Sequence, residues 1–481
     1  MVVRRILTLV LGSCACATVA WASPRTDPTA GRAVFTGAAT PHATSIGLDP
    51  AALGIGSIDQ LYVAVTGALD QLSIRLDGVD PATGASTGLG PRVRDTELGA
   101  GAMIALVYKI AGEFTLGFEA HSAPPESFPS GQRALQYHVL DGSERDLAAT
   151  AGASYKVANE LFVGASLSHQ TTFLRLSYVR DSALESAGGP GSVTCNDTAA
   201  CGYGNPDAAE TWNVDVRSPA LSTSNLRVNI GVVFQYHDVW LGVAYHTPPE
   251  SGVQTELAGH VVIDRASRDR RADPDHLAQI RGQSVVEVQF PASVDAELRA
   301  RLPADLDLHI GGRWEDLSRL SAYDIRAYGS TLPRLGVPEW TERPRGLHDA
   351  FAGWAGIEQI DRGQTWLFGG RAGFETASVT AARTSPLTIS PASLTLDLGA
   401  QARVAHGLIA QLSYGLQYFP TVDVTDSAFD PRDRAICIAK SFDYDAPECA
   451  AVRNGYAIST AAGSYGRFQH AVRFALRYDL Q

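Results

Sequence analysis

Strict alternation between apolar and polar side chains constrains this chain more than any other feature of its sequence. In residues 225–236, NLRVNIGVVFQY, every second side chain from Leu226 to Tyr236 is apolar, and the positions between them are mainly polar or glycine. The same pattern runs through residues 305–314, 393–404 and 467–480. A period of two residues is that of a β-strand with one apolar and one polar face. The sequence therefore predicts an all-β protein.

The length of the alternating stretches distinguishes two kinds of all-β protein. In a soluble sandwich the apolar faces of two sheets pack together, and strands are mostly about 5–6 residues long. A transmembrane barrel turns its apolar face to lipid and needs strands of about 9–11 residues. The stretches here are of the longer kind, and aromatic residues such as Tyr236, Trp240 and Tyr245 lie near their ends, as in interfacial girdles. We therefore predict a transmembrane β-barrel, with a soluble secreted β-protein such as a propeller as an alternative.

Short and long connections alternate between the expected strands. Short connections are expected at residues 111–113, 158–160, 237–238, 303–305, 361–364 and 405–407. Long connections are expected at residues 78–93, 123–145, 181–223, 265–283, 330–347, 378–391 and 426–464. Six short and seven long connections join fourteen antiparallel strands, with both ends of the chain on the short-turn side. Bacterial outer-membrane barrels are built in this way, with short periplasmic turns and long extracellular loops.

The first residues have the pattern of a secretory signal peptide. Two arginines precede an apolar run at residues 6–19, and a small-residue cleavage site follows, so residues 1–22 form the predicted signal. A transmembrane anchor and lipidation at Cys14 are the alternatives. Beyond this point no apolar run approaches the ~20 residues that a spanning helix needs. The chain is therefore expected to be exported and, if it enters a membrane, to cross it with strands.

Four cysteines of the expected mature chain form two close pairs in sequence. Cys195 and Cys201 lie in one long polar connection, and Cys437 and Cys449 lie in another. In an oxidising compartment such pairs indicate two disulfides that staple extracellular loops. A metal site is the alternative, and no histidine or Cys-x-x-Cys spacing accompanies the cysteines to support it. We expect no metal and no cofactor.

Residues 31–54 differ from everything that follows them. This segment is rich in Gly, Ala, Thr and Pro, has few charges, and shows neither a helical stripe nor strand alternation. It is too apolar for a solvated linker, and it directly precedes the alternating strands. We predict that residues 23–56 form a plug, or hatch, inside a barrel built by residues 57–481. The net charge of −12 argues against nucleic acid as a partner.

Several motifs resemble the FadL/TodX family of outer-membrane transporters for long-chain fatty acids and other hydrophobic compounds. The first is GRAVFTG followed by Asp49-Pro50-Ala51-Ala52-Leu53, where the family has an Asn-Pro-Ala-Ala-type motif in its hatch. Asp49 replaces the usual Asn, and both residue types can form the turn before proline. Further similar segments are residues 240–250, 290–318, 366–375 and 396–418. The resemblance extends over the whole expected mature chain.

The resemblance implies a barrel that passes hydrophobic molecules passively across the bacterial outer membrane when its hatch rearranges. It also implies a lateral opening beside a kinked third strand, here residues 114–122, with Gly117 as the candidate for the kink. Expected partners are a hydrophobic ligand, outer-membrane lipid and lipopolysaccharide, and the barrel-assembly machinery. A monomer is expected. A surface receptor or adhesin on the same barrel and a general diffusion porin are the alternatives.

Candidate ligand contacts follow from the polar faces and from the hatch. An acidic headgroup needs a cation in the lumen, and guanidinium groups bind carboxylates in a bidentate manner. The candidates are Arg227, Arg313, Arg371, Arg403 and Arg473 on the polar faces, and Phe35, Ile46 and Leu48 in the hatch. Ion pairing of the arginines with Asp305, Asp307 or Asp397 is the alternative. No Gly-x-Ser-x-Gly or His-Glu-x-x-His motif occurs, so the sequence predicts no enzyme.

Overall fold

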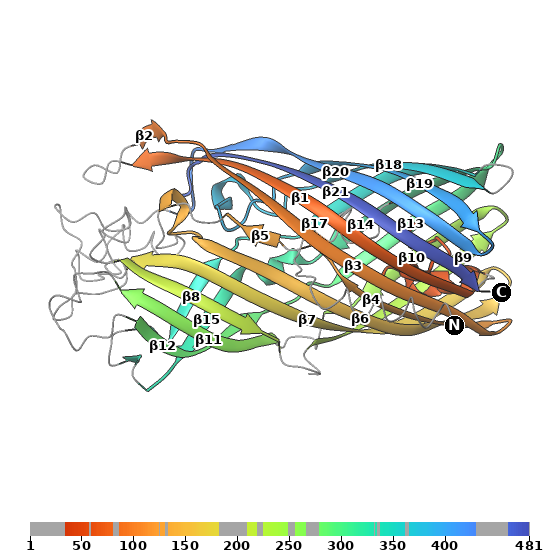
Figure 1. The fold of residues 1–481 in the computed structure, drawn as a ribbon, viewed down its shortest axis with the longest axis horizontal. Helices are drawn as coiled ribbons and strands as arrows, with labels where there is room; N and C mark the ends of the chain where they lie inside the picture. The colour runs from red at the N-terminus through yellow and green to blue at the C-terminus, as the bar shows by residue number, and fades with distance from the viewer. Residues whose placement is uncertain are drawn as a thin grey trace, which may run out of the picture.

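The computed structural model describes residues 34–56, 59–79, 86–124, 126–129, 133–181, 209–218, 225–248, 255–265, 279–330, 332–333, 337–360, 365–429 and 460–480. In this part of the chain, tilted strands surround one long axis and form a barrel (Figure 1). Within the same residues, no helix has the length and apolar character needed to cross a membrane.

A closed ring of fourteen antiparallel strands forms the barrel among the described residues. β21 closes the ring by pairing with β1, from Asp59 opposite Leu480 to Leu76 opposite Gly463. In order around the ring, the strands are β1 (Asp59–Val79), β3 (Val93–Ala111), β4 (Phe114–Ser122), β6 (Asp141–Ala158), β7 (Leu161–Asp181), β9 (Leu226–Tyr236), β10 (Val239–His246), β13 (Ser293–Leu302), β14 (Leu306–Glu315), β17 (Ala350–Ile360), β18 (Trp366–Glu375), β19 (Ser393–Ala405), β20 (Leu408–Val424) and β21 (Gly463–Leu480).

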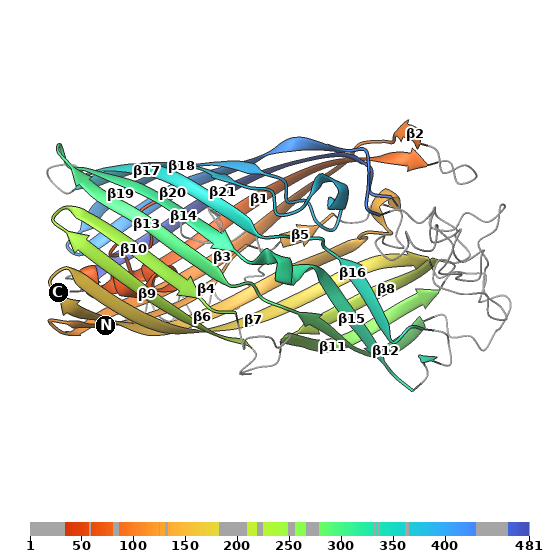
Figure 2. The same cartoon turned by 180° about the vertical axis from the view of Figure 1, so that it is seen from behind.

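Five further strands extend one side of the wall at the end away from the short turns (Figure 2). They are β8 (Ala209–Arg217), β11 (Thr255–Arg265), β12 (Gln279–Val288), β15 (Ala322–Tyr328) and β16 (Trp340–Pro344). β7 is long enough to pair with β9 along residues 161–169 and with β8 along residues 173–181. The other four strands follow β8 side by side in the order given. We call these five strands the outer sheet.

Short elements complete the described fold. Two short strands, β2 (Ser86–Leu89) and β5 (Glu126–Phe128), pair with β1 and β6. The 3₁₀ helices are η3 (Ala43–Gly47), η4 (Pro50–Ile55), η5 (Arg133–Leu135), η8 (Leu317–Leu320) and η10 (Ala381–Arg383). η3 and η4 belong to the segment before β1.

The ring strands turn their apolar side chains outward. On β9, the side chains of Val228, Ile230, Val232 and Phe234 are 41–53% exposed, whereas Asn229 between them is 3% exposed. Exposed apolar residues recur in this way on β4, β10, β19 and β21. An outward apolar belt around a ring of antiparallel strands is the surface that a barrel presents to lipid. The ring is therefore a transmembrane barrel of the outer-membrane type.

The outer sheet has the opposite arrangement. On β8, Trp212, Val214 and Val216 are buried on the inner face, and Asp215 and Arg217 are exposed on the outer face. The inner residues join a core with Phe128, Leu174, Leu176 and Tyr178 and with apolar residues of β11, β12 and β15. An outer face that carries charges is suited to water rather than to lipid. The alternation therefore reverses its direction between the ring and the outer sheet.

The structure confirms the predicted all-β, fourteen-stranded antiparallel barrel and its six short connections. The ring strands are joined at residues 112–113, 159–160, 237–238, 303–305, 361–365 and 406–407. Three of the expected long connections also contain or adjoin strands of the outer sheet. β8 lies within residues 181–223 and β16 within 330–347, and β12 begins at Gln279, inside 265–283. These strands were missed because their apolar residues point inward, into a core that only the folded barrel creates.

Candidate functional site inside the barrel

Two capped turns shape the segment before β1. The backbone N–H of Thr44 donates to Nδ1 of His42 at 3.2 Å, which caps η3. Burial, together with the positive charges of Arg477 and Arg473, lowers the pKa of His42 to about 3, so its ring stays neutral and can accept this bond. At η4, Oδ1 of Asp49 accepts from the N–H of Ala51 at 2.8 Å. Proline at the first helical position, Pro50, is preorganised for such a start.

Glycines on the inner face of the wall let this segment approach the strand backbones. A Cβ atom on Gly117 of β4 would lie 2.6 Å from Leu53 and 2.9 Å from Ile46, and Gly231 of β9 lies directly against the Asp49 carboxyl group. The other close approaches are Gly164 to Ala51, Gly242 to Ala38, and Gly369 and Gly399 to the ring of Phe35. Any larger residue at these positions would push the segment away from the wall.

Polar groups of the wall hold the segment by hydrogen bonds to residues 35–51. Glu358 of β17 accepts from the N–H of Phe35 at 3.2 Å, and Glu297 of β13 accepts from the hydroxyl of Thr40 at 3.1 Å. Arg371 of β18 donates to the carbonyl oxygen of Thr36 at 2.7 Å. Two further bonds join Ser154 to the carbonyl oxygen of Ala51 and Gln60 to the N–H of Ala43.

His309 links the two carboxylates that hold the segment. Its Nδ1 lies 3.3 Å from Glu297 and its Nε2 lies 3.5 Å from Glu358, and all three side chains are on the inner face of neighbouring strands. A protonated imidazole between two carboxylates donates to both and offsets their mutual repulsion. The three residues form one acceptor unit for Phe35 and Thr40, which we call the carboxylate clamp.

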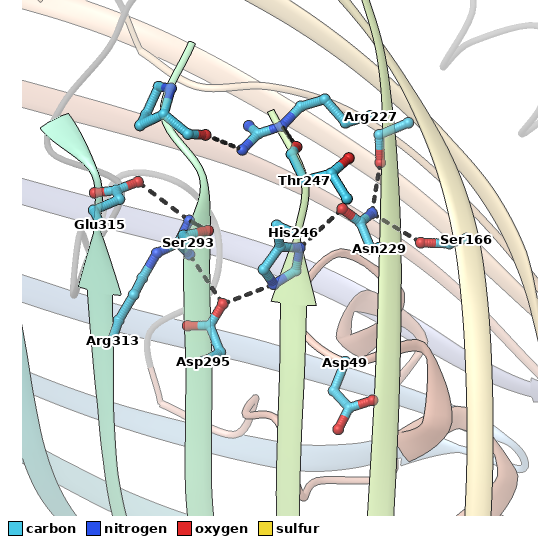
Figure 3. A network of polar contacts seen from close by, with 12 residues as sticks. Asp49, Ser166, Arg227, Asn229, His246, Thr247, Ser293, Asp295, Arg313 and Glu315 are labelled. Atoms are coloured by element: carbon cyan, nitrogen blue, oxygen red, sulfur yellow. Dashed lines mark hydrogen bonds and ion pairs between the residues drawn. The ribbon is translucent and has the colours of Figure 1, made fainter. Parts of the chain in front are cut away.

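A second polar network crosses the inner wall next to Asp49 (Figure 3). Asn229 donates to Ser166 at 2.9 Å and contacts Nδ1 of His246 at 2.9 Å, while Nε2 of His246 lies 2.9 Å from Asp295. Arg313 continues the network from Asp295, at 3.4 Å, to Glu315, at 3.3 Å. The contacts run through β7, β9, β10, β13 and β14, so this part of the lumen is lined by groups that already bond to one another.

The five candidate arginines differ in their contacts and in their exposure. Arg313 is ion-paired and Arg371 bonds to Thr36, while Arg473 is 2% exposed and donates to Thr66 at 3.3 Å. Arg403 is exposed at the short-turn end of β19, apart from the others. Arg227 donates to the carbonyl oxygens of Pro291, at 2.7 Å, and Thr247, at 3.2 Å, and within the described part of the chain it forms no ion pair.

The apolar candidates of the segment also differ in accessibility. Phe35 is 2% exposed and Ile46 is 0% exposed, and both are packed against inner-face glycines. Asp49, Pro50, Ala51, Ala52 and Leu53 are all buried. Leu48 is partly exposed, so it is the candidate that still offers surface to the lumen.

The wall is interrupted beside β3. β4 pairs with β3 only from Ala102 to Ala111, and among the described residues nothing pairs with the same side of residues 93–101. The chain leaves β4 after Ser122 and passes over Gly101, where a Cβ atom would lie 2.6 Å from the carbonyl oxygen of Ser122 and 2.8 Å from Pro124. Next to this point Leu98 is 83% exposed on the outer face. Gly117 lies within continuous pairing on both sides, and the pairing of β4 with β3 ends at Ser122.

Sequence reasoning missed the residues that hold the segment and those that interrupt the wall. Glu297, His309 and Glu358 occupy polar-face positions like many others in the alternation, and only the register of three strands shows that they meet. The dipeptide Pro124-Pro125 was a usable signal, because proline cannot donate a ladder hydrogen bond and ends regular pairing.

Two further sequence predictions concern cysteines and metals. Cys195, Cys201, Cys437 and Cys449 lie outside the described residues, as does the predicted signal peptide. Within the described ranges, no group of three or more His, Cys, Asp or Glu side chains is arranged to hold a metal ion.

Comparison with solved structures places the fold. The chain is similar to a FadL homologue of Pseudomonas aeruginosa, with a TM-score of 0.72 and 16% identity over 97% of this chain and 100% of that one. It is also similar to the P. putida toluene transporter TodX, with a TM-score of 0.56 and 12% identity over 90% of this chain and 93% of that one. The Ralstonia pickettii toluene transporter TbuX gives a TM-score of 0.56 and 16% identity over 92% and 94% of the two chains.

No protein-family model and no curated protein matches the sequence itself. The likeness is therefore one of architecture, and it covers nearly the whole of each chain compared. It agrees with the closed ring of fourteen strands and with the outward apolar belt. The chain therefore has the same fold as these solved barrels, a closed ring of fourteen antiparallel strands.

Proposed function

We propose that this protein is a passive channel for hydrophobic small molecules in the bacterial outer membrane, and that residues 34–56 are its hatch. The observation that carries the proposal is the fit of this segment against the inner-face glycines of the wall. A general diffusion porin needs a water-filled lumen, whereas the burial of this segment and its hydrogen bonds to Glu358 and Arg371 support a lumen that the segment blocks. The similar toluene transporters support a hydrophobic ligand.

The interruption beside β3 is the proposed exit. Among the described residues, nothing pairs with one side of residues 93–101, so a ligand can pass between β3 and β5 into the lipid without breaking a ladder. Such a route keeps an apolar molecule away from the polar networks in the lumen, where its burial would not be favourable. Leu98 offers an apolar surface at the outer side of this exit.

For a ligand with a carboxylate, such as a long-chain fatty acid, Arg227 is the proposed contact. Its guanidinium group bonds to two carbonyl oxygens and, in the part of the chain that the structure describes, to no carboxylate, so its positive charge is available to a ligand. Leu48 is the proposed apolar contact, because it is the partly exposed side chain of the hatch candidates. In this proposal the protein is not an enzyme, uses no cofactor, and acts as a monomer surrounded by lipid and lipopolysaccharide after insertion by the barrel-assembly machinery.

Uptake by cells tests the proposal. Cells that lack their own transporters of this kind would express the wild-type chain or a chain with Arg227→Gln, and be given labelled oleate or labelled toluene. We expect the wild-type chain to accelerate uptake of at least one probe, and Arg227→Gln to slow oleate alone. Uptake no faster than in cells without the protein would contradict the channel and favour a receptor or adhesin.

A further inference from the structure

Asp49 has a buried carboxyl group, and one of its two oxygens accepts no hydrogen bond from the described residues. Its side chain is 0% exposed and lies against Gly231, and Oδ1 is used by the N–H of Ala51. Oδ2 has no hydrogen-bond partner among the described residues. In Figure 3 its carboxyl group lies beside the network of His246 and Asp295 without joining it. An ionised carboxylate in such a place would lack both solvent and a counter-charge.

The charged and titratable groups around Asp49 are engaged elsewhere. Arg313 and His246 contact Asp295, His309 contacts Glu297, and His121 of β4 contacts Glu119 at 2.8 Å. Further such groups on neighbouring elements are Arg227 of β9, bonded to carbonyl oxygens, Asp146 of β6, bonded to Gln170 and Thr172, and His42 of the segment itself. Among the described residues, none forms an ion pair with Asp49.

The environment therefore favours the neutral acid. Burial raises the pKa of Asp49 well above its usual range, and the negative charges of Asp295 and Glu297 act in the same direction. The N–H groups of Ala51 and Ala52 act in the opposite direction and are outweighed. A protonated carboxyl group keeps the bond from Ala51 through its carbonyl oxygen and carries no charge into the protein interior.

We propose that Asp49 is a proton-binding site that couples docking of residues 34–56 to pH. The segment docks with Asp49 protonated, and when it leaves the wall the carboxyl group meets water and releases its proton to the solvent. This proposal rests on the proposed function only in that the segment can leave the wall. It adds that the pH of the surrounding solution changes the fraction of open channels.

The sign of the effect follows from linkage. The undocked carboxyl group has an ordinary pKa near 3.8, and the docked one has a higher pKa. Docking is therefore most favourable below the ordinary value and weakens as the pH rises from there toward the docked value. For one proton, undocking becomes up to about tenfold more favourable for each pH unit in this window.

Amide hydrogen exchange of the full-length protein in lipid vesicles tests the proposal without any transported ligand. Exchange of residues 43–55 would be compared between the wild type and Asp49→Asn at pH 5 and pH 8, as a ratio that cancels the chemical effect of pH. Asparagine is the neutral shape equivalent of the protonated acid. Asp215→Asn, on the exposed face of the outer sheet, is the matched control.

We expect the wild-type exchange, relative to Asp49→Asn, to increase by tenfold or more between pH 5 and pH 8, and Asp215→Asn to behave as the wild type. Equal ratios at both pH values would overturn the proposal, and so would failure of Asp49→Asn to assemble, because the neutral form is the docked form. If the ratio changes as expected but no hydrophobic probe is taken up, the proton site stands and the transport proposal fails.

Discussion

Pro124 lies over Gly101, and this contact marks the point where the wall of the barrel is interrupted. A Cβ atom at position 101 would lie 2.8 Å from Cδ of Pro124 and 2.6 Å from the carbonyl oxygen of Ser122. The chain can therefore bend inward here only because residue 101 has no side chain. Directly beyond this point no described residue pairs with this side of β3, so the local geometry of two residues accounts for an opening along residues 93–101.

Gly101→Val is expected to slow uptake of a hydrophobic probe. The added side chain overlaps the backbone of residues 122–124 and therefore opposes the inward bend that leaves the opening along residues 93–101. Overpacking of this kind costs about 1–3 kcal/mol. Gly67→Val is the matched control, since Gly67 is on neighbouring β1 and a Cβ there meets nothing within 4 Å. Uptake equal to that of the control variant would show that the interruption is not the route.

Gly164→Ala is expected to undock the hatch. Its Cβ would meet the backbone of Ala51, which cannot move unless the whole of η4 moves. Ion currents across planar bilayers should rise relative to the wild type, whereas Gly67→Ala should leave them unchanged. Currents that stay at the wild-type level in Gly164→Ala would argue against residues 34–56 as the element that closes the lumen.

Glu358→Ala removes one side of the carboxylate clamp. The N–H of Phe35 then loses its acceptor at 3.2 Å, and an unsatisfied buried donor costs about 1–3 kcal/mol. Amide exchange at residues 35–40 should accelerate by roughly tenfold, since 1.4 kcal/mol corresponds to a factor of ten. Glu287→Ala, which removes an ion pair with Arg326 on the outer sheet, should leave this exchange unchanged. Unchanged exchange in both variants would mean that the clamp does not hold the segment.

Val232→Arg and Asn213→Arg test the reversal of the alternation. Val232 is on the lipid-facing side of β9, where an arginine near the bilayer midplane costs about 2–4 kcal/mol. Asn213 is on the outer face of β8 and accepts a hydrogen bond from Ser177 at 2.8 Å, so the cost should be that of one lost hydrogen bond, about 0.5–1.5 kcal/mol. Unfolding in urea from lipid vesicles measures both. A large loss in Asn213→Arg would place the outer sheet in lipid.

The ring could be predicted from the sequence because its chemistry is local. Alternation such as that of Leu226 to Tyr236 predicts both the strand and the side chains that face lipid. The short turns then determine which consecutive strands pair with each other. The outer sheet could not be predicted in the same way. Trp212 and Val214 become inner residues only because β7, a strand more than thirty residues earlier in the chain, continues beyond the ring to pair with β8.

The contacts of the candidate site could not be predicted from the sequence. The small, uncharged side chains around Asp49 led to the prediction of a hatch, and in the structure the same residues lie against glycines of the strands. The residues that hold it depend on register: Glu297, His309 and Glu358 lie on three strands, and a shift of one residue in any of them would turn that side chain to lipid. Periodicity alone cannot show such a meeting.

The ring and the outer sheet have opposite alternation, and this also determines how deeply the protein inserts in the membrane. The ring can move outward only by exposing Val228 and its neighbours to water, and the outer sheet can sink only by bringing Asp215 and Arg217 into hydrocarbon. Both displacements are unfavourable, so the membrane surface lies where β7 changes from pairing with β9 to pairing with β8. The two surfaces therefore fix the depth to which the protein inserts in the membrane, and with it the position of the interruption beside β3 along the membrane normal.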